Sequence, residues 1–273
     1  MPDSITQLAD WDPAVTIKHL PGLDEEELLQ FRPFVDWTAA LKVSIEEQKH
    51  HGHPFNEAPY NLKHIRVDSF DRGRERLLFV KIFAQIENKN GETLPGVVFL
   101  RGGSVTVLMI LRPFDAPDER YVVMTEQPRP AAGSLRFLEI PAGMLDDHND
   151  VVGEAAREIE EEVGIKLKRS DLIDMTALAL KDHSTQGYVK DAMYPSPGAC
   201  DEFIKIFLWE QEKERTEIDD LKDRLAGERG HQEKITVRLM NYERLLQIGA
   251  RDGKTLAAWS LYEYLKRARL LSL

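Results

Sequence analysis

The chain contains two kinds of hydrophobic pattern, which predict helices in some stretches and strands in others. Apolar residues that recur every three to four positions indicate a helix with one buried face, whereas short continuous or alternating apolar runs indicate strands. The first pattern predicts helices at 24–29, 34–47, 152–163 and 256–270. The second predicts strands at 77–86, 97–100, 105–111, 121–125, 203–209 and 235–239. This mixture predicts an α+β fold rather than a doubly wound parallel sheet.

Several local features follow from the same pattern. In the second of these helices Val35, Ala39 and Val43 lie roughly on one face. The pair Asn90-Gly91 is typical of a tight hairpin turn after the first strand. The densely charged stretch 212–228 is compatible either with a helix or with an irregular excursion, and the pattern leaves both open.

Composition and charge exclude some classes of protein. The chain has 273 residues, with 36 basic and 47 acidic side chains and a net charge of −11, which argues against a nucleic-acid partner. Cys200 is the only cysteine, so an intramolecular disulfide is impossible. No uncharged apolar run reaches the roughly 18 residues that span a bilayer, and the N-terminus lacks the features of a secretion signal. We therefore expect a cytoplasmic protein without a membrane partner.

Two groups of residues could bind a metal ion. His50, His51 and His53 lie beside Gly and Pro, and we interpret them as a solvated turn rather than as a metal site. The second group lies on the helix 152–163. One stripe of this helix is apolar and consists of Ala155, Ile159 and Val163.

Three glutamates share another face of the same helix. Glu158 and Glu162 are four residues apart and Glu161 is three residues from Glu158, so like charges are stacked one turn apart. A divalent cation would convert this repulsion into ligation, because Mg²⁺ prefers carboxylate oxygens and shares its shell with substrate phosphates. Gly143 permits a close turn before the helix, and Gly164 is placed to end it. A Glu-rich helix that is simply solvated remains the alternative on these residues alone.

The spacing from Gly143 to Ile165 resembles the Nudix box of the Nudix hydrolases. That pattern runs Gly, five residues, Glu, seven residues, Arg-Glu, an aliphatic residue, any residue, Glu-Glu, any residue, Gly and an aliphatic residue. Eight positions are in register, namely Gly143, Arg157, Glu158, Ile159, Glu161, Glu162, Gly164 and Ile165. The first Glu of the pattern is replaced by Asn149, and the adjacent Asp150 is the candidate substitute.

Further segments are similar to the ADP-ribose and ADP-sugar pyrophosphatases of this family, and closest to the plant-type ADP-sugar diphosphatases. They are 126–129, 138–143, 194–202 and 232–235. The resemblance implies a Nudix-type α/β/α sandwich with a mixed β-sheet over residues 96–273. It also implies a homodimer, with a region of helices and strands over residues 1–95 that serves dimerisation or substrate binding.

The resemblance further implies a metal-dependent enzyme. It would hydrolyse the pyrophosphate bond of a nucleoside diphosphate sugar, such as ADP-ribose or ADP-glucose, to AMP and a sugar phosphate. Mg²⁺ is the expected cation, with Mn²⁺ as a second possibility. Two alternatives remain open, namely GDP-mannose or a dinucleotide as the substrate, and a catalytically silent domain that only binds nucleotide.

The same resemblance assigns roles to individual residues. The expected metal ligands are the side chains of Glu158, Glu161, Glu162 and Glu233 and the carbonyl of Ala142. The expected catalytic residues are Glu161, Glu162, Glu202, His231 and Glu233. The expected substrate-binding residues are Arg129 for the diphosphate, Glu139 for an adenine amino group, and Gly143.

Some of these roles have structural alternatives. Arg129 could form a surface ion pair, Glu139 could be a charge at a strand edge, and Glu202 could cap loop amides. Arg157 is expected to fix the glutamates by ion pairing rather than to touch substrate. Glu161 is either a third metal ligand or a residue that supports the other two.

Overall fold

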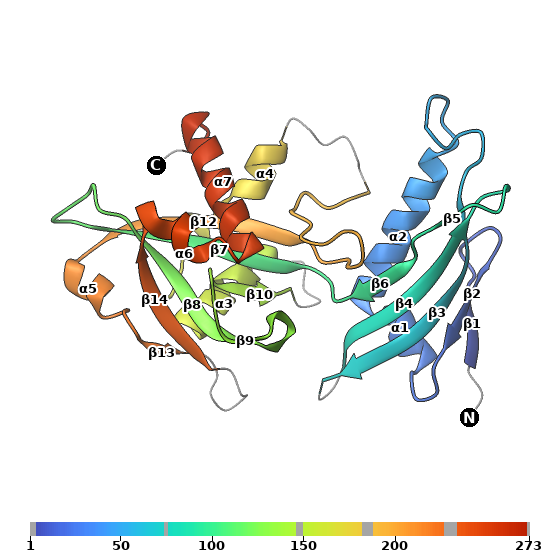
Figure 1. Cartoon of the computed structure of the whole chain (residues 1–273), viewed down its shortest axis with the longest axis horizontal. Coiled ribbons are helices and arrows are strands. Elements are labelled where there is room, and N and C mark those ends of the chain that lie inside the picture. Colours follow the sequence, from blue (N-terminus) through green and yellow to red (C-terminus); the bar gives the residue numbers. More distant parts are fainter. Residues whose placement is uncertain (1–3, 74–75, 146–149, 182–187, 227–233, 272–273) are drawn as a thin grey trace. The chain divides into compact units, whose positions relative to one another are not determined.

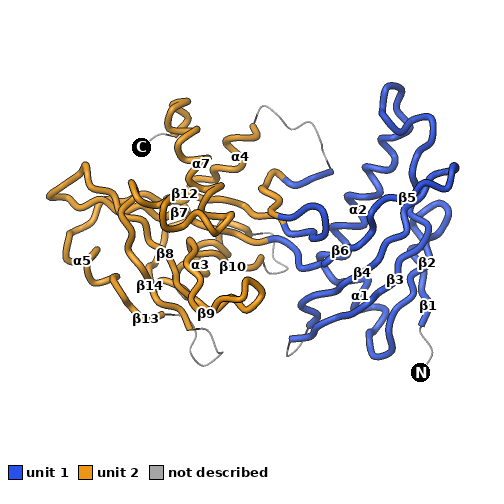
Figure 2. The backbone as a smooth tube through the Cα atoms, viewed as in Figure 1, with its two compact units in different colours: residues 1–103, 185–190, 196–202 blue, residues 104–184, 191–195, 203–273 orange. Residues whose placement is uncertain are grey.

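The computed structural model describes residues 4–73, 76–145, 150–181, 188–226 and 234–271 (Figure 1). The chain forms two compact units, which Figure 2 colours separately. The first contains 1–103, 185–190 and 196–202, and the second contains 104–184, 191–195 and 203–273. The separate roles expected for 1–95 and 96–273 stay a prediction.

The first unit is built on a six-stranded sheet. Its strand order is β1 (Ser4–Leu8), β2 (Val15–His19), β3 (Asn61–Arg72), β4 (Leu77–Glu87) and β5 (Thr93–Leu94), with β6 (Val97–Leu100) also paired to β4. Strands β2 and β3 are parallel, and the other pairs are antiparallel. The sequence pattern did not predict β1 and β2, each of which is five residues long. The predicted turn is present, and Gly91 has a φ of 80° there.

Two helices of the first unit contribute to its core, α1 (Glu25–Gln30) and α2 (Arg32–Glu47). The Asp24 side chain caps α1 by accepting a hydrogen bond from the Glu27 amide at 3.0 Å. The face of α2 that carries Val35 and Val43 is exposed, since the two residues are 40% and 47% exposed. Instead α2 buries the face that carries Phe34, because the aromatic ring removes more apolar surface from water than the valines do.

The second unit contains an eight-stranded mixed sheet, as predicted. Its order is β11 (Ile173–Asp174), β12 (Ile204–Lys213), β7 (Ser104–Pro113), β8 (Tyr121–Arg129), β14 (Ile235–Asn241) and β13 (Leu225–Ala226). In addition, β10 (Ala142–Met144) pairs with β7 and β9 (Ser134–Glu139) pairs with β8. Only the β12–β7 pair among these is parallel.

Helices cover both faces of this sheet, so the predicted α/β/α sandwich is confirmed (Figure 1). Alternate residues of β7 enter two separate cores, because successive side chains of a strand point to opposite faces. Val107 packs in the core that contains α3 (Val151–Val163), whereas Leu108 packs with α4 (Met175–Leu180) and α7 (Gly253–Arg267).

The remaining helices are short, α5 (Arg215–Asp219) and α6 (Leu245–Gly249). The charged stretch 212–228 therefore contains the end of β12, one turn of helix and β13 within its described part. His50, His51 and His53 lie in the turns after α2, as expected. Within the described ranges, no helix is both long and apolar enough to cross a membrane.

Candidate active site

The helix α3 presents two of the predicted glutamates, Glu158 and Glu162, to the strand β10. The Asp150 carboxylate caps its N-terminus by accepting from the Gly153 amide at 3.0 Å, and it pairs with Arg169. Gly164 ends the helix with a φ of 73°, the left-handed conformation that glycine adopts freely. The apolar stripe predicted on α3 is buried in the core shared with β7, which leaves the glutamate face toward β10. Asn149 lies outside the described residues.

Glu162 is a buried carboxylate with two hydrogen-bond donors. The residue is only 6% exposed. The Ala142 amide donates to Oε2 at 3.1 Å, and the Gln127 amide group donates to Oε1 at 3.2 Å. Burial raises the pKa of Glu162 to about 8, and the negative charges of Glu158 and Glu139 add to this shift, while the two hydrogen bonds oppose it.

Glu158 lies one helical turn before Glu162, directly against Gly143. A Cβ atom added to Gly143 would overlap the Glu158 carboxylate, so this side chain can keep its present position only beside a glycine. Nη2 of Arg157 lies 3.7 Å from Oε1 of Glu158. The start of β10, Ala142–Gly143, therefore contacts both Glu162 and Glu158, and two acidic side chains converge there.

Glu161 has a different environment. Its side chain is 35% exposed and accepts a hydrogen bond from Nη1 of Arg157 at 3.2 Å. Arg157 also pairs with Glu154 one turn earlier, so it links acidic residues along the helix, as its predicted role requires. Over the part of the chain that the structure describes, no three His, Cys, Asp or Glu side chains are grouped closely enough to hold a metal ion by themselves.

Arg129 and Glu139, both predicted to bind substrate, contact one another. Nε and Nη2 of Arg129 lie 2.7 and 2.6 Å from Oε1 of Glu139. The Arg129 side chain is 42% exposed, whereas that of Glu139 is 3% exposed. A third residue, Lys254 of α7, places its ammonium group 2.7 Å from Oε2 of Glu139. Sequence reasoning did not identify Lys254, since a lysine in the first turn of a helix has no feature that marks it as buried.

The other predicted residues lie elsewhere or are not described. Glu202 belongs to the first unit, where Nη1 of Arg101 lies 3.3 Å from its Oε1. The neighbouring Asp201 accepts hydrogen bonds from the amides of Arg101 and Gly102 at 2.8 and 3.1 Å. His231 and Glu233 lie outside the described residues, so their predicted roles stay predictions.

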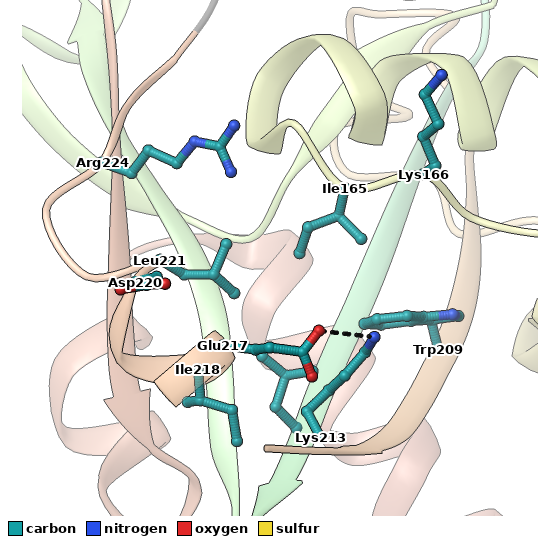
Figure 3. Close-up of a pocket in the computed structure, with 10 residues that line it drawn as sticks. Ile165, Lys166, Trp209, Lys213, Glu217, Ile218, Asp220, Leu221 and Arg224 are labelled. Carbon is teal, nitrogen blue, oxygen red and sulfur yellow. Dashed lines mark ion pairs between the residues drawn. The ribbon is translucent and has the colours of Figure 1, made fainter. Parts of the chain in front are cut away.

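A separate cavity of about 340 Å³ lies beyond the C-terminal end of α3 (Figure 3). It is lined by apolar side chains that include Ile165 and Trp209, together with Arg224 and the ion pair between Lys213 and Glu217. None of the predicted site residues that the structure describes lines it. The converging glutamates and this cavity are therefore different features of the second unit.

Comparisons with known proteins find similar sequences for most of the chain. A family model described as NUDIX domain matches residues 101–259, which include all of α3. The chain is 43% identical over 213 residues to Nudix hydrolase 14, chloroplastic, from Arabidopsis thaliana, covering 77% of this chain and 65% of that protein. It is 29% identical over 138 residues to ADP-ribose pyrophosphatase from Bacillus subtilis (strain 168), covering 50% of this chain and 62% of that protein.

The chain thus spans somewhat less than two thirds of the length of these curated relatives. A solved structure described as an ADP compounds hydrolase superposes with a TM-score of 0.45 at 16% identity, covering 76% of this chain and 97% of the other.

Proposed function

The chain belongs to the Nudix family, and from this premise we propose that it hydrolyses the pyrophosphate bond of a nucleoside diphosphate sugar. ADP-ribose and ADP-glucose are the proposed substrates, and AMP and a sugar phosphate the products. The name of the Bacillus subtilis relative favours ADP-ribose among them. The observation that carries the proposal is the convergence of Glu158 and Glu162 on the start of β10, Ala142–Gly143.

The two glutamates fit a divalent cation. Glu162 is buried, and its pKa is raised partly by the negative charge of Glu158, so a cation beside them would offset an unfavourable concentration of charge. Mg²⁺ keeps several water ligands and is commonly held by one or two carboxylates together with substrate phosphates, so a site without three clustered side chains suits it. Mn²⁺ is the second candidate.

The residues that would hold the cation are those that converge at the start of β10. We assign Glu158 and Glu162 as its main side-chain ligands and the Ala142 carbonyl as a backbone ligand. Glu161 supports them, either as a further ligand or through Arg157, and Glu233 is the proposed additional acidic ligand. The cation would polarise the phosphoryl group and lower the pKa of a bound water.

Other residues of the chain would bind the substrate and move the proton. The planar guanidinium of Arg129 matches the geometry of a diphosphate, and Glu139 fixes it in place. Glu233 or His231 would accept the proton of the attacking water, since histidine changes its charge near neutral pH. Glu202 is proposed to orient the substrate or the catalytic loop.

The test is hydrolysis of a panel of nucleotide sugars by the wild-type protein and by Glu162→Gln with Mg²⁺ or Mn²⁺. Glutamine keeps an oxygen for the Ala142 amide but lacks the charge, so we expect a folded variant with turnover lowered by about 10³-fold or more. Glu160→Gln is the matched control, because Glu160 lies on the same helix but pairs with Lys166 at the surface. Wild-type activity of Glu162→Gln would refute the assignment.

The products decide between the remaining alternatives. AMP and a sugar phosphate from ADP-ribose or ADP-glucose support the proposal. If only GDP-mannose or a dinucleotide is hydrolysed, that compound is the substrate instead. Nucleotide binding without any turnover indicates a catalytically silent domain. We also propose a homodimer in the cytoplasm. A monomer in light scattering at micromolar concentration would contradict the dimer, and cell fractionation tests the compartment.

A further inference from the structure

Four side chains of alternating charge form a continuous chain in the second unit. Arg129 contacts Glu139, Glu139 contacts Lys254, and the Lys254 ammonium lies 2.9 Å from Oδ1 of Asp252. The chain runs from the half-exposed guanidinium of Arg129 to Asp252, which is only 4% exposed. Burial would lower the pKa of Lys254, but the charges of Asp252 and Glu139 outweigh it and the pKa is raised. Lys254 is therefore a part-buried cation, with 18% of its side chain exposed, held between two carboxylates.

The backbone beside this chain of charges is fixed by the same helix end. Asp252 caps α7, and its Oδ2 accepts from the amide and the hydroxyl of Thr255 at 3.1 and 2.8 Å. The Thr255 hydroxyl oxygen in turn accepts from the amide of Ile140, next to Glu139, at 3.3 Å. The first turn of α7 thus holds both the side chain of Glu139 and the backbone that follows it. Two residues further along, Ala142 begins β10, the strand that contacts Glu158 and Glu162.

We propose that Lys254 is a positioning residue, which fixes the guanidinium of Arg129 through the carboxylate that both cations share. The two oxygens of Glu139 are divided between them, since Arg129 takes Oε1 with two of its nitrogens and Lys254 takes Oε2. This proposal rests on the proposed function only for the identity of the group that Arg129 binds, a diphosphate.

The division of the two oxygens explains why a cation is needed at position 254. If Lys254 were replaced by an uncharged side chain, Oε2 of Glu139 would be buried without a partner, which is unfavourable. An arginine binds a carboxylate most readily as a fork, with one nitrogen on each oxygen. Arg129 would therefore rotate to cover both oxygens, and its guanidinium would leave the orientation in which it faces substrate.

The kinetic test compares Lys254→Met, Arg129→Met and the double variant, with ADP-ribose and Mg²⁺. Lys254→Met should raise KM about tenfold while kcat changes by less than about threefold, because a ground-state contact is lost. In the Arg129→Met background the same change should have almost no further effect, which a double-mutant cycle measures. Lys254→Arg should restore most of the affinity. Lys205→Met is the matched control, since Lys205 is a part-buried lysine that pairs with Asp174 at 3.3 Å.

A second readout does not depend on activity. The Nε–H signal of Arg129 in a ¹H–¹⁵N spectrum, assigned with Arg129→Lys, should shift in Lys254→Met and in the milder Lys254→Gln, and stay in place in Lys205→Met. An unshifted signal, or additive effects of Lys254→Met and Arg129→Met, would overturn the positioning role. If the wild-type protein hydrolyses no nucleotide sugar, the proposed function fails, and the spectrum still decides the role of Lys254.

Discussion

The amide nitrogen of Ala142 donates a hydrogen bond to Oε2 of Glu162 at 3.1 Å, although the two residues are 20 positions apart. The next residue, Gly143, lies directly against the carboxylate of Glu158. Two consecutive residues of β10 therefore contact glutamates on consecutive helical turns of α3. This relationship explains the spacing between the glycine and the glutamates in physical terms, because a side chain at position 143 and the Glu158 carboxylate cannot occupy the same space.

The first prediction concerns this contact. Gly143→Ala should displace the Glu158 side chain from β10. A displacement of about 1 Å in a site of this kind costs on the order of 10²-fold in turnover. The variant should stay folded, because the change affects one side chain at the surface of the core. Steady-state hydrolysis of the preferred nucleotide sugar measures the loss, and circular dichroism checks the fold.

Gly253→Ala provides the control for that experiment. A Cβ atom on Gly253 meets no other atom within 4 Å, and alanine is favoured over glycine at a helical position. Its activity should equal that of the wild-type protein. Equal activity in Gly143→Ala would mean that Glu158 does not need its present position.

The second prediction separates two roles of Asp150. The Asp150 carboxylate caps α3 and pairs with Arg169, and we predict that these contacts, rather than the supply of the acid that Asn149 lacks, are its role. Asparagine caps helices about as well as aspartate. Asp150→Asn should therefore keep full turnover and a stability within about 0.5 kcal/mol of the wild-type value, since it loses only an exposed ion pair. Turnover and urea unfolding measure both, and loss of metal-dependent activity alone would instead make Asp150 a ligand.

The sequence allowed α3 and the order of its glutamates to be predicted, because both depend on spacing over one or two helical turns. The buried side of α2 could not be predicted in the same way. The Val35 face and the Phe34 face both have helical spacing, and only packing against the sheet selects the latter. The contact between Glu139 and Lys254 joins residues 115 positions apart, for which a single sequence contains no signal.

The third prediction tests the first unit. The carbonyl of Gly96 accepts from the Ala84 amide at 2.7 Å, and a Cβ atom on Gly96 would overlap the Ala84 backbone oxygen. Backbone cannot move aside as a flexible side chain can, so Gly96→Ala should destabilise this unit by about 1–3 kcal/mol. Urea unfolding followed by circular dichroism measures the change. Val97→Ala, at a side chain 47% exposed, should change the stability far less, and similar losses in both variants would contradict the argument.

The fourth prediction uses two aspartates of the first unit whose pKa values are shifted in opposite directions. Burial raises the pKa of Asp201, although the amides of Arg101 and Gly102 donate to it. The folded protein therefore holds a proton on Asp201 more tightly than the unfolded chain does. The stability that Asp201 contributes is greatest below the ordinary aspartate pKa of about 3.9, and it falls as the pH rises through the raised value. As the pH rises from about 4 to about 7, the unfolding free energy of the wild-type protein should therefore fall relative to that of Asp201→Asn.

Asp68 is the control with the opposite sign. The hydrogen bond from Arg66 lowers the pKa of Asp68 despite some burial, so its contribution is present above the ordinary aspartate pKa and is lost as the pH falls. The difference between wild type and Asp68→Asn should thus grow in favour of wild type as the pH rises from about 3 to about 5. Urea unfolding of the three proteins over both pH ranges, from about 3 to about 7, gives both differences. Slopes of the same sign for Asp201 and Asp68 would show that burial does not control the charge of Asp201.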